Sequence, residues 1–183
     1  MLRLGLPFMV ALSLSACTTG GAYRSIGADL PGMVVSIADA TWNGQQIPKS
    51  GICSNDGGND RGPALFVRDI PDGANAIIVQ FNDLDHPSLD RNGGLGSIGL
   101  WLEGASEALF PPVTGYSVDM PRRVFIERGA LTRGRTASQG YLAPCSGGHG
   151  HRYAAEVLAV YKATAAGEIN RVLARQPLML GRY

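Results

Sequence analysis

Tyr141-Leu-Ala-Pro-Cys-Ser-Gly-Gly-His-Gly-His-Arg-Tyr153 is, with Asp83-Leu-Asp-His-Pro87, the most informative part of this 183-residue chain. The two segments hold all three histidines, His86, His149 and His151. Imidazole titrates near neutral pH and binds anions or metals in different protonation states. Its confinement to two loop-like segments therefore predicts that any chemistry of this protein lies there.

The two segments have complementary chemistry. Asp83 and Asp85 are two residues apart, so both side chains point to one face while the chain stays extended. Two carboxylates this close need solvent, a proton, a cation or backbone amides. In the second segment, glycines allow close approach of a ligand to the backbone, and His149, His151 and Arg152 offer donors to an anion. The alternative to a binding site is that the first segment is only an exposed acidic turn and the second only a glycine-rich loop.

Most of the predicted elements are strands. Residues 33–38 and 76–81 are short, β-branched apolar runs between turn-forming residues, which favours buried strands. Weaker candidates are 64–67, 98–102 and 124–127. Residues 153–161 suit either a helix or a strand.

One segment reads as a helix near the C-terminus. Thr164 is a candidate N-cap, and Ile169, Val172 and Leu173 recur at helical spacing before Pro177 ends the pattern. Many strands and one late helix predict a mainly β fold, a sandwich of two sheets with a C-terminal helix. Without a repeat or second linker, residues 30–183 are expected to form one domain.

The N-terminus is typical of an export signal. Arg3 precedes an apolar run that is too short to span a bilayer, and the run ends in Leu14-Ser15-Ala16-Cys17. These residues resemble the lipobox of bacterial lipoproteins, which implies a signal peptide over 1–16 and lipidation of Cys17. Acyl chains such as palmitate would then hold the chain on a membrane. An ordinary secretory signal is the alternative.

The rest of the N-terminal region fits an anchored protein. Residues 17–29 are small and polar and predict a flexible tether. Because Thr18 rather than aspartate follows Cys17, the resemblance implies the cell envelope, at the outer membrane facing the periplasm. Lys and Arg number 16 against 15 Asp and Glu, so the near-neutral charge argues against nucleic acid as a partner. In an oxidising compartment, Cys53 and Cys145 would form a disulfide or remain as two free thiols.

The order and content of these motifs resemble the phosphatidylethanolamine-binding protein family, also called Raf kinase inhibitor-like proteins. Its Asp-Pro-Asp-x-Pro motif matches 83–87, and its Tyr-x-Gly-Pro-Cys-Pro-Pro segment with the later His-Arg-Tyr matches 141–153. The resemblance implies a β-sandwich, a strand over 153–161 and a pocket for a phosphate-like or other small anion. The implied ligand-binding residues are Asp83, Asp85, Pro144, His151, Tyr153 and Tyr183.

Two departures from the family keep other functions open. Leu100-Trp101 matches a family His-Trp, and Ser146-Gly147 matches Pro-Pro. A binding protein with neither cofactor nor enzyme activity is the preferred interpretation. One alternative is a structural or protein-interaction lipoprotein with a degenerate pocket. Another is a zinc-dependent hydrolase, in which His149 and His151 would join Asp83, Asp85 or His86 as ligands.

Overall fold

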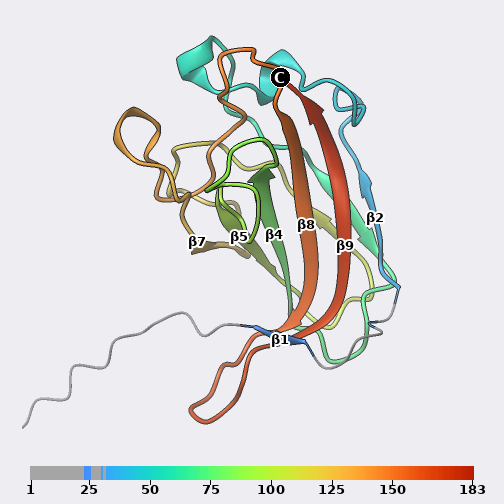
Figure 1. The fold of residues 1–183 in the computed structure, drawn as a ribbon. Coiled ribbons are helices and arrows are strands. Elements are labelled where there is room, and N and C mark those ends of the chain that lie inside the picture. The colour runs from blue at the N-terminus through green and yellow to red at the C-terminus, as the bar shows by residue number, and fades with distance from the viewer. Residues whose placement is uncertain (1–22, 26–29, 31) are drawn as a thin grey trace, which may run out of the picture.

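The fold is a sandwich of two β-sheets (Figure 1). A computed structural model describes residues 23–25, 30 and 32–183. The larger sheet has six strands in the spatial order β1 (Arg24–Ser25), β9 (Arg171–Arg182), β8 (Arg152–Tyr161), β4 (Ala76–Asp83), β5 (Ser97–Trp101) and β7 (Val124–Arg128). The smaller sheet has the order β2 (Val34–Ile37), β3 (Leu65–Arg68) and β6 (Ala108–Phe110). The predicted two-sheet β-sandwich is therefore confirmed.

The main core lies between the two sheets. Alternate residues of a strand face opposite sides of a sheet, and on β4 the side chains of Ile77, Val79 and Phe81 point inward. They pack in one buried cluster with Leu65 and Val67 of β3. The first half of β4 is apolar on both faces because its inner face lies in this core, while Ala76 and Ile78 on its outer face lie in a second buried cluster.

A second, smaller cluster covers part of the outer face of the larger sheet. It is formed by Ala76, Ile78, Leu158, Val160 and Val172. Tyr23, Leu30, Trp101 and Phe125 pack against it. The outer face is therefore apolar at the end of the sheet where β1 lies beside β9.

The predicted C-terminal helix is wrong, because residues Arg171–Arg182 form β9 and pair with β8 along their length. Among the described residues the helical elements are three 3₁₀ turns, η1 (Lys49–Gly51), η2 (Ser54–Asp56) and η3 (Gly134–Thr136). The helical spacing is coincidental: Ile169 precedes the strand and is half exposed, and Leu173 is the extra residue of a bulge between Val172 and Ala174.

Pro177 lies inside β9 instead of ending a helix. It is opposite Glu156 of β8, and among the described residues the backbone on the other side of β9 is paired only at its two ends, at Arg171–Val172 with β1 and at Arg182 with Gln46. Proline is tolerated in such an edge position because its missing N–H breaks no ladder there.

The predicted signal peptide and Cys17 lie outside the described residues, as does most of the predicted tether 17–29. Three residues of the tether range are described, and they contact the domain. Arg24–Ser25 pair in parallel with β9, and the Tyr23 hydroxyl donates a hydrogen bond of 3.1 Å to Glu127. No helix among the described residues is long and apolar enough to cross a membrane.

Candidate functional site

The two informative segments meet at one end of the sandwich, at the top of Figure 1. Asp83 is the last residue of β4 and pairs with Tyr153 near the start of β8. Tyr183 follows β9 and donates its backbone N–H to the carbonyl of His151. Antiparallel pairing of β4 with β8 thus brings together residues that are far apart in the sequence, as the sequence predicts.

Asp83 and His151 form the centre of the site. The His151 Nδ1 lies 2.8 Å and 3.1 Å from the two carboxylate oxygens of Asp83. The Asp83 side chain is buried, with 7% exposed, and 27% of the His151 side chain is exposed. Because a carboxylate only accepts hydrogen bonds, Nδ1 carries the proton and Nε2 is left for another partner. The backbone N–H of Asp85 also donates to Asp83, at 3.1 Å.

Asp85 lies beside this pair, and its carboxylate is paired with the Arg152 guanidinium. Arg152 donates to its carboxylate from Nε at 3.0 Å and from Nη2 at 2.6 Å, and the Arg152 backbone N–H adds a bond of 2.7 Å. The Arg152 hydrogen bonds lower the pKa of Asp85 well below its usual range. Asp85 therefore joins the acidic turn to the start of β8, and 32% of its side chain is exposed.

Two phenols lie under the site with unpaired hydroxyls. The hydroxyls of Tyr141 and Tyr153 are buried, and neither makes a hydrogen bond of normal geometry within the described residues. The Tyr153 hydroxyl nevertheless lies close enough to Ser146, the Cys145 backbone and Asp83 for all three to affect its pKa. Burial is the largest cause that raises the pKa of each phenol, and the Asp83 charge adds to it for Tyr153. A buried hydroxyl without a partner is costly and usually has a structural or functional reason.

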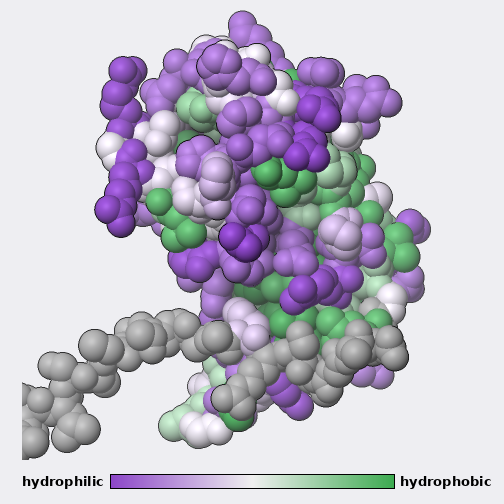
Figure 2. Space-filling view, in the orientation of Figure 1, coloured by the Kyte–Doolittle hydropathy of each residue, from purple (hydrophilic) through white to green (hydrophobic). Residues whose placement is uncertain are grey.

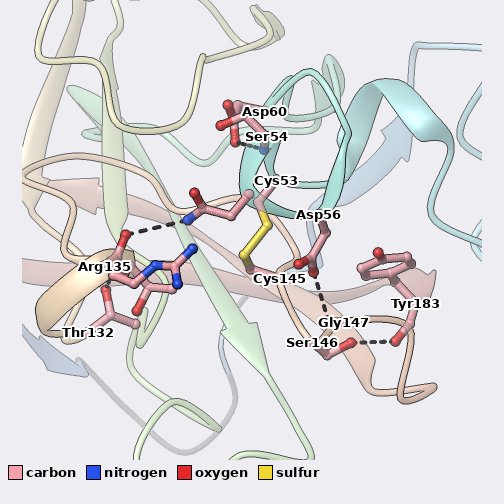
Figure 3. The surroundings of a disulfide bond; sticks show 12 residues. Cys53, Ser54, Asp56, Asp60, Thr132, Arg135, Cys145, Ser146, Gly147 and Tyr183 are labelled. Atoms are coloured by element: carbon pink, nitrogen blue, oxygen red, sulfur yellow. Dashed lines mark hydrogen bonds between the residues drawn. A yellow bond between two sulfur atoms is a disulfide. The ribbon is translucent and has the colours of Figure 1, made fainter.

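The predicted disulfide between Cys53 and Cys145 is present (Figure 3). It joins the residue before η2 to the loop that leads to His151. Beside it, the buried Pro144 accepts a bond from the Cys53 N–H through its carbonyl, at 2.9 Å. Ser146 Oγ donates to the Tyr183 carbonyl at 2.7 Å. Gly147 N–H donates to Asp56 at 2.8 Å. These bonds hold the loop against η2 and the end of β9.

Asp56 is a site residue that the sequence analysis missed. Besides receiving the Gly147 bond, its charge helps to raise the pKa of the Tyr183 phenol, for which burial is the larger cause. The only sequence signal was that Asp56 follows Cys53 by three residues. This spacing places Asp56 near residues 145–147 only if Cys53 is bonded to Cys145.

The other two histidines make no side-chain hydrogen bond to Asp83 or His151 among the described residues, although the His86 backbone N–H donates to the Asp83 carbonyl at 3.3 Å. His149 and His86 are exposed, and His86 lies 3.2 Å from Ser88. In the described part of the chain, one group of three candidate metal ligands has its ligand atoms within 4.8 Å of one another: Cys53, Asp56 and Cys145. The two sulfurs of that group are bonded to each other. The structure does not gather the ligand set of the zinc alternative.

Leu100, which the sequence analysis matched to a histidine of the family, does not lie at this site. Leu100 pairs with Ile77, near the opposite end of β4 from Asp83, and is buried in the main core. At the end of β4 that carries Asp83, the backbone is hydrogen-bonded to Leu89 and Leu95. The Asp83 N–H donates to the Leu89 carbonyl, and the Leu95 N–H donates to the Phe81 carbonyl.

Comparisons with known proteins support the fold alone. No family model and no curated protein matches the sequence. The solved structure of YbcL from E. coli, a new member of the mammalian PEBP family, is similar with a TM-score of 0.52 and 17% identity, over 82% of this chain and 97% of that chain. CT736 from Chlamydia trachomatis D/UW-3/CX, a proposed phosphatidylethanolamine-binding protein homologue, has a TM-score of 0.45 and 21% identity, over 82% and 96%. The likeness to YbcL confirms that the two-sheet fold is PEBP-like.

Proposed function

We propose that this protein is a membrane-anchored binding protein whose site at Asp83, His151 and Tyr153 takes a small anionic or phosphate-containing ligand. The observation that carries the proposal is the hydrogen-bonded Asp83–His151 pair beside a buried phenol whose hydroxyl has no partner. A phospholipid head group and a free phosphate compound share this chemistry.

The polarity of the site favours an oxyanion ligand. With Nδ1 held by Asp83, the other nitrogen of a protonated His151 donates a charge-assisted hydrogen bond, and the Tyr153 hydroxyl supplies a neutral donor. The glycines at 147, 148 and 150 adopt positive φ, a backbone conformation that glycine takes without steric cost, and so shape the loop between the disulfide and His151. Asp83 orients the imidazole and balances its charge.

Replacement of His151 by alanine tests this proposal. The variant should bind inorganic phosphate and phosphoethanolamine at least tenfold more weakly in calorimetry, because one charge-assisted hydrogen bond contributes about 1.5–3 kcal/mol. His149→Ala is the matched control, since His149 lies two residues away and is exposed; its binding should equal that of the wild type. Equal loss in both variants, or none in His151→Ala, would overturn the proposed site. No binding by the wild type to either compound would favour a structural or protein-interaction lipoprotein.

The sequence supports anchoring through Cys17 in the cell envelope, at the outer membrane facing the periplasm. In Cys17→Ala cells, incorporation of labelled palmitate into the protein should be lost, and the chain should move from the membrane to a soluble or unprocessed fraction. The control is His149→Ala, which changes an exposed residue and leaves both Cys17 and the disulfide in place, and it should keep the label. Unlabelled wild-type protein, or equal label in Cys17→Ala, would contradict the anchor.

A further inference from the structure

A cleft of about 470 Å³ lies on the outer face of the larger sheet, away from the Asp83–His151 site. Its polar side chains form one row across the strands. Arg128 of β7 pairs with Ser97 of β5, Ser97 with Gln80 of β4, and Gln80 with Glu156 of β8. Because paired residues on neighbouring strands point to the same face, these four side chains line the cleft together.

The charged groups of the cleft are paired within the protein. Arg175 lies 3.3 Å from Glu156. Glu127 accepts hydrogen bonds from Tyr23 at 3.1 Å and from Lys162 at 2.7 Å. The Arg128 guanidinium donates to the Asn92 carbonyl. A simple anion or cation would therefore have to break an existing pair, which argues against an ionic ligand.

Two polar side chains of the cleft have no hydrogen-bond partner among the described residues, and both are neutral. Ser97 is 2% exposed, and its hydroxyl has no hydrogen-bond partner among the described residues. The side-chain amide of Gln80 has none within the described part of the chain either, and Gln80 is half-buried. Together they offer a hydroxyl, an amide donor and an amide acceptor at adjacent positions.

Apolar side chains lie beside this polar row. Leu158 and Val172 are 3% and 2% exposed and form the buried floor of the cleft, and the half-buried Tyr23 also lines it. A second cleft of about 570 Å³ continues from Glu156 and Arg175 to the apolar side chains of Leu178 and Met179. Figure 2 shows apolar green areas on both sides of a purple polar area on this face.

We propose that this outer-face cleft binds a neutral, hydroxyl-rich ligand, namely a saccharide. Sugar hydroxyls both donate and accept hydrogen bonds, as the unpaired Ser97 hydroxyl and Gln80 amide require. The C–H face of a sugar ring suits the half-buried aromatic ring of Tyr23, which lines the same cleft. The proposal does not depend on the anion site, because the two sites share no lining residue.

Titration of the full chain with cellobiose and with N,N′-diacetylchitobiose tests this cleft. The chain is kept in a detergent without a sugar headgroup, and binding is followed by calorimetry and by backbone amide NMR shifts. The expected result is saturable binding, with the largest shifts at Gln80, Ser97 and Glu156. Saturable binding with shifts elsewhere, or no binding of either disaccharide, overturns the proposal.

Two variants separate a binding role from a structural one. Ser97→Ala and Gln80→Met should each weaken disaccharide binding at least tenfold. Because the Ser97 hydroxyl has no partner in the free protein, Ser97→Ala should keep or raise the melting temperature. Gln45→Met is the control, since Gln45 is exposed and outside the cleft, and it should bind as the wild type does. Unchanged affinity in Ser97→Ala would refute the assignment.

Discussion

The double variant Cys53→Ala/Cys145→Ala should lose about 4.5 kcal/mol of its free energy of unfolding. The disulfide joins residues 92 positions apart, and cross-linking so long a loop restricts the unfolded chain by about that amount in the chain-entropy account. Since single domains have only about 5–15 kcal/mol of stability, the variant should be close to unfolding at 37 °C. Equilibrium unfolding in urea at neutral pH measures the change.

Reduction of the wild type gives an independent control for this prediction. The wild type in a strong reductant should match the double variant, whereas Cys17→Ala should unfold as the wild type does, because Cys17 is not part of the bridge. Phosphate binding should also weaken in the double variant, since the bridge holds the loop in which Gly147 bonds Asp56. A loss below about 1 kcal/mol would show that the hydrogen bonds around the bridge hold the loop without it.

Raising the pH from 10 to 12 should remove roughly 5 kcal/mol of stability through Tyr141 and Tyr153. Burial raises the pKa of both phenols in the folded protein above the unfolded value of about 10. A raised folded pKa gives stability that is complete below pH 10 and is lost as the pH rises toward the folded value. Each phenol contributes up to about 1.4 kcal/mol per pH unit in this window.

Absorbance at 295 nm and circular dichroism, recorded together, measure this effect. Of the six tyrosines, Tyr141 and Tyr153 should ionise only with loss of the fold, and Tyr23, whose pKa is raised by burial and by Glu127, should also ionise late. Tyr141→Phe and Tyr153→Phe should each reduce the alkaline sensitivity. Tyr141→Phe should also keep the stability at pH 7, because the Tyr141 hydroxyl has no partner among the described residues. Full ionisation of all six tyrosines with an intact fold would contradict the prediction.

The centre of the site was predictable because it depends on strands with a clear local signal. The run of β4 is β-branched and apolar, and the motif resemblance marked β8 as a strand, so antiparallel pairing of the two was enough to bring Asp83 to His151. Asp56 was not predictable, since it reaches the site only through the Cys53–Cys145 bridge and the bond to Gly147.

From the sequence alone came the mainly β class, the meeting of the acidic turn with the histidine loop, and the pair of cysteines available for a disulfide. Those features rest on local composition and on motifs that each lie within a few residues. The tertiary structure alone decided that residues 171–182 are a strand, because pairing with β8 outweighs a weak helical spacing. It also decided that Ser97, Gln80 and Glu156 share one cleft, since their alignment depends on the register of three strands that no local pattern specifies.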